Sequence, residues 1–276
     1  MSDYLKKFKQ LTSKWGIYQH GLLSIPNPEF GYAIDDQARA LIVAHQFNQY
    51  KLEKIFLNFI LNSKIDDTYY HYFYDNKNSI SPDITHQASE DALGMVVWAL
   101  IETGNTTGDS KKVIQNILTK AKSWIFLRSI AYILLGLTES KKTILEDDLV
   151  KKIIDSYKED NGWNWFEDKL TYGNALIPWA LWKRARTRQD NKSLEVAKKA
   201  TEFLLKIYQK DGTPMPVSHL GLRKDDNNRL YKLYETKLRD EMPGVHAGGR
   251  LGMYRYLNMD QAIGPAMTLV GRLVNG

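Results

Sequence analysis

NGWNWFEDKLTYGNALIPWAL, the stretch from Asn161 to Leu181, decides the fold that we expect for this chain. It gathers into a turn the side chains of Trp163, Trp165, Glu167, Asp168, Tyr172 and Asn174, and then opens an apolar helix. The residues from Leu176 to Leu181 have the spacing of a buried helix face. Polar groups therefore sit at a helix start, where backbone N–H groups lack partners and the macrodipole favours negative charge.

Two earlier stretches have the same design. YAIDDQARALIVA, which begins at Tyr32, places Asp35 and Asp36 before an apolar helix. HQASEDALGMVVWAL places Glu90 and Asp91 in the same position. If the three helix starts converge, they form an acidic pit lined by aromatic rings, and we interpret that pit as a carbohydrate site.

The composition is that of a soluble globular protein. The 276 residues, 43% hydrophobic and 25% charged, suffice for one large core, so we expect a single domain over 1–276. The net charge is +6, but lysines and arginines are scattered rather than striped, so no nucleic-acid partner is expected. Cysteine is absent, which leaves no disulfide, thiolate nucleophile or Cys-type zinc site.

The sequence predicts no membrane span. Its start, MSDYLKKFKQL, lacks the apolar core of a signal peptide. The longest apolar run, IFLRSIAYILLGL, is too short to cross a bilayer and contains Arg128. A cytoplasmic location is therefore the expectation.

Apolar residues at helical spacing predict nine helices, followed by an irregular region over 210–246, a short helix over 247–256 and another helix over 260–274. The nine are expected over 4–15, 35–47, 49–61, 90–104, 111–122, 124–137, 146–157, from 171, and 192–208. Apolar helices beside polar motifs alternate with helices that carry lysine-rich faces, and the apolar ones start at intervals of roughly 35 to 55 residues, as in stacked helical hairpins. We therefore predict an all-α protein, an (α/α)6 toroid-like array that is incomplete at its C-terminal end. A flat α-solenoid is the alternative.

Two local features refine this prediction. The tyrosine-rich connection over 66–86 has alternating aromatic residues that would suit a short hairpin, but Pro82 and the Asn/Ser content favour a loop. Pro178 lies inside the helix expected from 171, which predicts a kink or a later start.

The same stretches resemble a known family. YAIDDQARALI resembles the Thr-Thr-Asp-Asp-Asn-Ala-Arg-Ala-Leu signature of six-hairpin glycosidase-like proteins, which are often encoded near, or fused to, glycosyltransferases. HQASEDALGMVVWAL is similar to that family's Ser-Glu-Asp…Gly…Trp-Ala-Leu segment, and WNWFEDKLTYGNALIPWAL to its Trp-x-Trp-Phe-Glu…Leu-Thr-Tyr-Asp-Asn-Ala…Pro segment. KDGTPMPVSHLG and MDQAIGPAM are faintly similar to two C-terminal segments. The resemblance implies an (α/α)6 toroid, a role in glycan metabolism and a glycosyltransferase as candidate partner.

The chain also departs from the family pattern. Gln37 stands where the family has Asn, and Gly173 stands where it has Asp. The family's final Glu has no clear match near Asp260. The loss of carboxylates leaves a non-catalytic sugar binder as an alternative.

Glycoside hydrolysis needs two carboxylates, about 5–5.5 Å apart for retention and about 6.5–9.5 Å apart for inversion. The catalytic candidates are Asp36, Glu90, Asp91 and Glu167. Helix capping is the alternative at the first two motifs. Asp35 and Asp36 would cap their helix, or Ser89 would cap the next helix with Glu90 and Asp91 in its first turn.

The substrate-binding candidates are Asp35, Arg39, His86, Trp163, Trp165, Tyr172, Asn174 and His246. Arg39 shares a helix face with Asp36 and would hold a carboxylate in place, or form a buried structural pair. The two tryptophans suit stacking on the C–H face of a pyranose, although core packing is the better interpretation for one of them.

The remaining binding candidates are polar. Tyr172 and Asn174 would bond sugar hydroxyls, although Asn174 could equally bond nearby backbone. His86 and His246 could move a proton, although a lone loop histidine is more often ordinary.

The preferred hypothesis is a glycosidase-like hydrolase acting on an oligosaccharide or polysaccharide, with Glu90 or Asp91 and Glu167 as working carboxylates. A sugar epimerase or lyase is the second, and would use His86, His246 or Tyr172 to transfer protons. A non-catalytic module that binds a glycan or assists a glycosyltransferase is the third. No cofactor is expected, and the histidines are too dispersed for a metal site.

Overall fold

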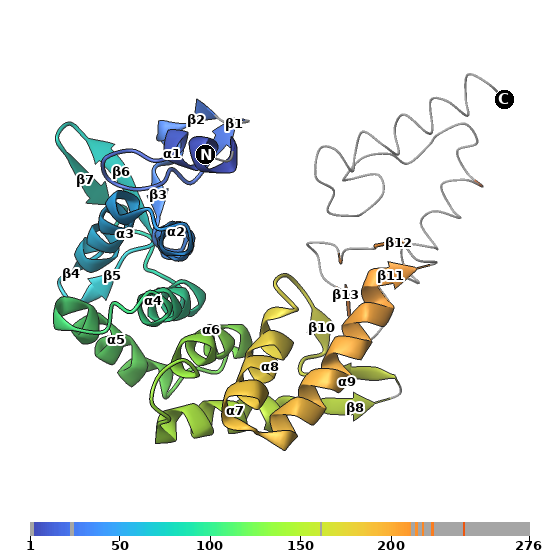
Figure 1. Ribbon diagram of the computed structural model, residues 1–276. Helices are drawn as coiled ribbons and strands as arrows, with labels where there is room; N and C mark the ends of the chain where they lie inside the picture. The colour runs from blue at the N-terminus through green and yellow to red at the C-terminus, as the bar shows by residue number, and fades with distance from the viewer. Residues whose placement is uncertain are drawn as a thin grey trace. The chain divides into compact units, whose positions relative to one another are not determined.

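A computed structural model describes residues 3–22, 25–160, 162–210, 213–214, 217, 222–223 and 240 (Figure 1). The chain divides into two compact units, and we describe each by itself. Unit 1 comprises Met1–Ile154 and Trp179–Leu194, and unit 2 comprises Asp155–Pro178 and Glu195–Gly276. The prediction of a single domain stays a prediction.

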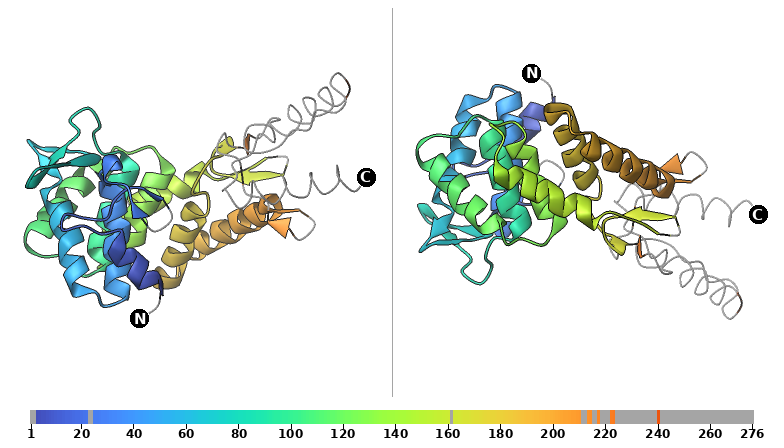
Figure 2. Two further views of the ribbon diagram at one scale, coloured as in Figure 1. Left: turned by 90° about the horizontal axis from the view of Figure 1, so that it is seen from above. Right: turned by 90° about the horizontal axis from the view of Figure 1, so that it is seen from below.

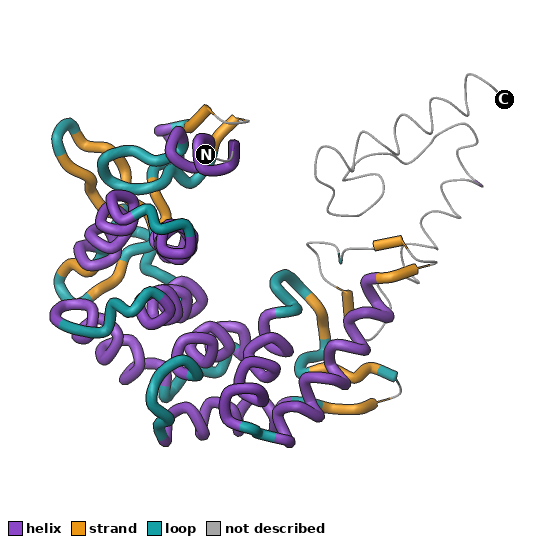
Figure 3. Tube along the Cα trace, in the orientation of Figure 1, coloured by secondary structure: helices purple, strands orange, loops and turns teal. Residues whose placement is uncertain are grey.

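The prediction of an all-α toroid is wrong. Short antiparallel strands stand between the helices in the described part of the chain, which is therefore of mixed α and β class (Figure 3). The connections that we expected as loops are the cause. β6 (Tyr72–Asn76) pairs with β7 (Ser79–Pro82), and β8 (Lys158–Asp160) pairs with β9 (Trp163–Trp165). Alternating aromatic residues stabilise such pairs, so the hairpin alternative for 66–86 is the one that forms.

Unit 1 is built mainly from helices that follow one another along the chain. Figure 2 shows the molecule from two further sides. The α-helices of the described chain are α1 (Asp3–Gln10), α2 (Ile34–Gln46), α3 (Tyr50–Asn62), α4 (Glu90–Glu102), α5 (Gly108–Ala121), α6 (Leu127–Leu137), α7 (Ile144–Ser156), α8 (Leu176–Arg188) and α9 (Asn191–Tyr208). The boundaries between the units fall within α7, α8 and α9. α2, α4 and α6 each contribute more buried apolar side chains than any other helix of unit 1, as their apolar sequences predict.

α4 packs between α2 and α6. Gly94 of α4 lies so close to α6 that an added Cβ would be 2.8 Å from the Ser129 carbonyl oxygen. Gly136 in turn lies against Trp98, where an added Cβ would be 3.1 Å from its Cα. The contacts advance in the same direction on both helices, so α4 and α6 run parallel and their N-terminal ends lie together.

Backbone hydrogen bonds tie the starts of α2 and α4 to one segment. The Ile34 N–H donates to the carbonyl oxygen of His71, and the N–H of His71 donates to the carbonyl oxygen of His86. β3 (Tyr32–Ala33) pairs with β6 beside this segment. The short elements that complete unit 1 are β1 (Gly21–Leu22), β2 (Ile25–Pro26), the 3-10 turn η1 (Pro28–Phe30), β4 (Lys64–Ile65) and β5 (Thr68–Tyr69).

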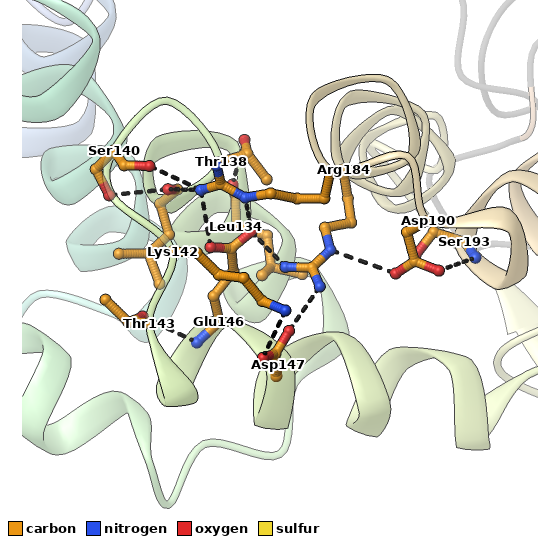
Figure 4. A network of polar contacts seen from close by, with 12 residues as sticks. Leu134, Thr138, Ser140, Lys142, Thr143, Glu146, Asp147, Arg184, Asp190 and Ser193 are labelled. Carbon is orange, nitrogen blue, oxygen red and sulfur yellow. Dashed lines mark hydrogen bonds and ion pairs between the residues drawn. The ribbon is translucent and has the colours of Figure 1, made fainter.

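An ionic network centred on a buried carboxylate joins the start of α7 to α8 within unit 1 (Figure 4). Glu146 is 0% exposed, and its carboxylate accepts from Arg184 at 2.5 Å and from Arg188 at 3.0 and 3.1 Å. Arg184 also donates to Asp147 and Asp190 at 2.6 and 3.3 Å. We define these five residues as the Glu146 network.

Unit 2 centres on aromatic side chains. Trp165 is 1% exposed, and its ring contacts Phe166 and Phe203. Trp163 contacts Phe203 from the same hairpin. The other described strands of unit 2 are β10 (Lys169–Leu170), β11 (Gln209–Lys210), β12 (Thr213–Pro214) and β13 (Leu222–Arg223).

The Pro178 prediction is confirmed as a late start. α8 begins at Leu176 rather than near 171, which places Pro178 in its first turn, where a missing N–H costs no intrahelical bond. The two helices predicted after residue 246 lie outside the described residues. No described helix has both the length and the apolarity to cross a membrane.

Candidate functional site

The first group of candidate residues stands at the start of α2. Arg39 donates to Asp35 at 2.9 Å and to Asp36 at 2.6 Å, so one guanidinium holds both carboxylates. The N-cap residue of α2 is Ala33, whose side chain offers no cap bond. Asp35 and Asp36 therefore lie within the first turn and do not occupy the capping position. They benefit from the helix dipole and remain partly exposed.

Burial shapes the ionisation of this group. It raises the pKa of Asp36 above its ordinary value, against the opposing hydrogen bond from Arg39. His71 approaches Asp35, with Nε2 3.5 Å from Oδ1. This approach does not meet hydrogen-bond geometry, and the buried Oδ1 has no hydrogen-bond partner among the described residues.

The second group stands at the start of α4, where Ser89 caps the helix by accepting from the Ala92 N–H at 3.2 Å. Asp91 accepts from Arg128 Nε at 2.7 Å and from the Ser129 hydroxyl at 2.5 Å. Both partners belong to the first turn of α6. The Asp91 carboxylate thus links the N-terminal ends of two parallel helices and is held in one orientation.

Glu90 differs from its neighbour. Its Oε2 is buried and finds no hydrogen-bond partner within the described part of the chain. Burial and the adjacent charge of Asp91 raise the pKa of Glu90 above its ordinary value. A carboxyl in this environment holds its proton to a higher pH than a solvated glutamate, which is the property required of a general acid.

Two histidines and a tyrosine lie close together in the chain segments that precede α4. The Tyr72 ring contacts His71 at 4.4 Å and His86 at 5.5 Å between centroids. His86 Nδ1 lies 2.8 Å from the Asp83 carboxylate and 2.8 Å from the Thr85 hydroxyl. A proton on Nδ1, bonded to Asp83, leaves Nε2 as the basic nitrogen of His86.

The tryptophans and Glu167 lie in unit 2. The Trp163 indole donates to the backbone carbonyl of Glu167 at 2.8 Å, and the Glu167 side chain is exposed. Trp165 is enclosed in the aromatic core of the unit, whereas Tyr172 is exposed. The indole therefore fixes the turn that carries the candidate carboxylate.

Asn174 is buried, and its amide is fully used within unit 2. It accepts from the Thr171 N–H at 3.0 Å and donates to the Thr171 carbonyl at 3.2 Å and to the Tyr208 hydroxyl at 2.9 Å. The preceding Gly173 has φ +62°, a left-handed conformation that glycine adopts without strain. Bonding to nearby backbone is thus the role that this geometry gives Asn174.

Unit 1 holds six of the predicted site residues, namely Asp35, Asp36, Arg39, His86, Glu90 and Asp91. Unit 2 holds Trp163, Trp165, Glu167, Tyr172 and Asn174, while His246 lies outside the described residues. We define the acid end of unit 1 as the side chains of Asp35, Asp36, Arg39, His71, Glu90 and Asp91. The packing of α2 against α4 and the backbone bonds of His71 bring their parent segments together.

Sequence reasoning missed His71, Arg128 and Ser129. Arg128 carried a signal, because it is the one charge in the apolar run of α6 and stands in its first turn. His71 sits in an alternating aromatic segment, and only strand pairing reveals that its position lies between two helix starts.

The acid end offers two carboxyl groups of raised pKa, Asp36 and Glu90, a carboxylate pair held by Arg39, and the imidazole of His71. These groups suit proton transfer and the binding of a polyhydroxylated ligand. Among the described residues, no three His, Asp or Glu side chains are grouped so as to hold a metal ion. No model of a known protein family matches this sequence, and no curated protein or solved structure is significantly similar to it.

Proposed function

We propose that the chain is a glycan-active protein, specifically a glycosidase-like hydrolase that works with carboxylates at the starts of α2 and α4. Hydrolysis of a glycosidic bond needs an acid that protonates the leaving oxygen and a carboxylate that activates water or attacks the sugar. Glu90 is the proposed acid. Asp36 is the proposed base or nucleophile.

The unpaired Oε2 of Glu90 is the observation that carries this proposal. A structural carboxylate at a helix start is normally satisfied by hydrogen bonds, as Asp91 is by Arg128 and Ser129. Glu90 instead keeps one buried oxygen without a partner and has a raised pKa. Perturbed ionisation of this kind is concentrated at functional sites.

Asp36 has matching properties. Its ionised form is a stronger base than that of a solvated aspartate, because burial raises its pKa. Arg39 donates to it at 2.6 Å and fixes its orientation. Arg39 and Asp35 would also bind sugar hydroxyls.

The resemblance to six-hairpin glycosidase-like proteins adds support, since two of its motifs contain these carboxylates. The departure at Gln37 has a structural explanation. Gln37 is buried, and its amide bonds both the N–H and the carbonyl of Ile17 at 2.8 Å. That position therefore serves folding here, and the change from Asn removes no carboxylate.

A sugar epimerase or lyase is the second candidate, and one observation favours it. His71 and His86 both contact Tyr72, and Asp83 orients His86. Epimerisation or elimination removes a proton from carbon, which requires a base such as imidazole. This candidate uses the same ligand class and a different pair of groups.

The test is turnover of manno- and gluco-oligosaccharides by wild type, Glu90→Gln and Asp36→Asn. Glu195→Gln is the matched control, because Glu195 is an exposed glutamate of α9 paired with Lys199. Release of new reducing ends that both site variants abolish, with the control unaffected and all variants folded, is the expected result. Running the reaction in deuterium oxide identifies epimerase chemistry by label incorporated at carbon, and an unsaturated sugar product identifies lyase chemistry.

Binding without turnover in any of these assays would overturn the hydrolase proposal. It would favour a module that recognises a glycan or assists a glycosyltransferase. If no saccharide binds, the glycan proposal itself fails.

A further inference from the structure

One face of α4 extends from the acid end toward the C-terminal end of the helix. Asp91, Trp98 and Glu102 are seven and four residues apart, which places them on a single helix face, and each is partly exposed. Gly94, between Asp91 and Trp98, is buried against α6. Trp98 is seven residues from Asp91, or about 10 Å along the helix axis at the usual rise per residue.

An aromatic cluster surrounds Trp98. Its ring stacks on Tyr132 of α6 with centroids 6.2 Å apart, and it meets Trp179 of α8 edge to face at 5.3 Å. We define Trp98, Tyr132 and Trp179 as the aromatic platform. All three residues belong to unit 1.

Fixed charges border the aromatic platform. The Trp98 indole donates to Glu102 Oε2 at 3.2 Å, and Lys183 lies 3.0 Å from Glu102 and 2.9 Å from Glu139. Lys183 follows Trp179 by one helical turn and is only 9% exposed. Its ammonium and the two carboxylates thus form an ion-paired set of donors and acceptors beside the rings.

The exposure of Trp179 distinguishes the aromatic platform from a cluster of core aromatic side chains. Trp165, a core tryptophan of the same chain, is 1% exposed, whereas Trp179 is 47% exposed. Trp182, on the next turn of α8, is 37% exposed. An indole left this open beside ordered polar groups has the make-up of a ligand site, in which rings supply contact area and a few polar groups supply orientation.

We propose that the aromatic platform is a second saccharide-binding position, which holds a sugar unit of the oligosaccharide whose reacting bond lies at the acid end. Trp179 stacks on the C–H face of the pyranose, and Glu102 and Lys183 bond its hydroxyls. The platform lies along the same helix face as Asp91, so the ligand is a chain of several sugars rather than a single sugar. The inference rests on the proposed function.

Calorimetric titration with disaccharides and hexasaccharides of mannose and glucose tests this inference. The measurement uses Glu90→Gln protein, so that no ligand is consumed. Trp179→Ala in that background should weaken hexasaccharide binding by at least about tenfold, as expected for loss of an aromatic anchor, and should leave disaccharide binding unchanged. Trp179→Phe should restore part of the affinity. Tyr50→Ala is the control, because Tyr50 is an exposed aromatic residue on α3.

The outcomes distinguish this inference from the function on which it rests. If oligosaccharides bind and are turned over, but Trp179→Ala in a folded protein binds both lengths as before, the platform is no subsite and the hydrolase proposal stands. If no saccharide binds the parent protein, both proposals fail. Circular dichroism of each variant establishes that it is folded.

Discussion

Unit 1 contains two groups of charged side chains that differ in how fully they are satisfied. In the Glu146 network, the carboxylate of Glu146 is 0% exposed and accepts three hydrogen bonds from Arg184 and Arg188. At the acid end, the carboxylates are partly exposed, and one buried oxygen each of Asp35 and Glu90 lacks a hydrogen bond. Both groups lie at helix starts, since Glu146 stands in the first turn of α7.

This difference distinguishes charged groups that stabilise the fold from charged groups that remain available to bind or react with a ligand. Removing two guanidiniums and a carboxylate from water is costly. The structure offsets that cost with the hydrogen bonds that join Glu146 to Arg184 and Arg188. A buried carboxyl oxygen without a hydrogen bond does not stabilise the fold. It retains capacity for a ligand, and the following predictions test whether the two groups divide in this way.

Glu146→Ala should have the largest effect. It leaves Arg184 and Arg188 without their shared buried carboxylate, so the free energy of unfolding should fall by about 3–5 kcal/mol. Urea denaturation followed by circular dichroism measures the loss.

Asp148→Ala is the control for that experiment, because Asp148 is an exposed carboxylate on the same helix and its loss should change stability by less than about 0.5 kcal/mol. Equal, small effects of both substitutions would mean that the Glu146 network does not stabilise the fold, and the contrast with the acid end would disappear.

Asp91→Ala should have the next largest effect, and it tests a carboxylate that does not follow the contrast between the two groups. Asp91 belongs to the acid end but is bonded to Arg128 and Ser129 of α6. Its removal should cost about 2 kcal/mol, since hydrogen bonds to a charged group are lost and a buried hydroxyl loses its partner. A loss similar to that of an exposed site in urea denaturation would show that Asp91 is not structural and would put it beside Glu90 as a catalytic candidate.

Gly94→Ala tests whether the close approach of α4 and α6 holds the acid end in place. A Cβ at this position would lie 2.8 Å from the Ser129 carbonyl oxygen and 3.0 Å from Tyr132 Cβ. Overpacking should outweigh the better helix propensity of alanine and cost about 1 kcal/mol. Gln115→Ala on the exposed face of α5 is the reference substitution. If Gly94→Ala proves as stable as that reference in urea, the helices can separate freely at this point.

The helices were predictable from the sequence because apolar periodicity determines which face each buries. α2, α4 and α9 lie close to their expected ranges, and the acidic pairs stand where the motifs placed them. Pro178 set the start of α8 through its missing N–H. These are local properties, so a single sequence contains them.

The strands and the partners of each charge were not predictable in the same way. β6 and β7 are short, and their pairing decides between a hairpin and a loop that the residues alone leave open. The bond between Asp91 and Arg128 joins residues 37 positions apart. Nothing in the local pattern distinguishes Glu90, which keeps an unpaired oxygen, from Asp91, which does not, because the distinction arises from the packing of α6.

Glu90→Gln should have the smallest effect on stability, and its sign depends on pH. The pKa of Glu90 in the folded protein is raised above its ordinary value of 4.5, so the folded state holds the proton more tightly than the unfolded state. As the pH rises through 4.5 toward the raised pKa, the unfolded state releases its proton first, and wild type loses stability that Glu90→Gln keeps. The variant should thus gain relative to wild type from acidic to neutral pH, as urea denaturation at a series of pH values will measure. A relative loss over that range would mean that ionised Glu90 is stabilised in the folded protein, which would make it a structural carboxylate like Glu146 and end its candidacy as the general acid.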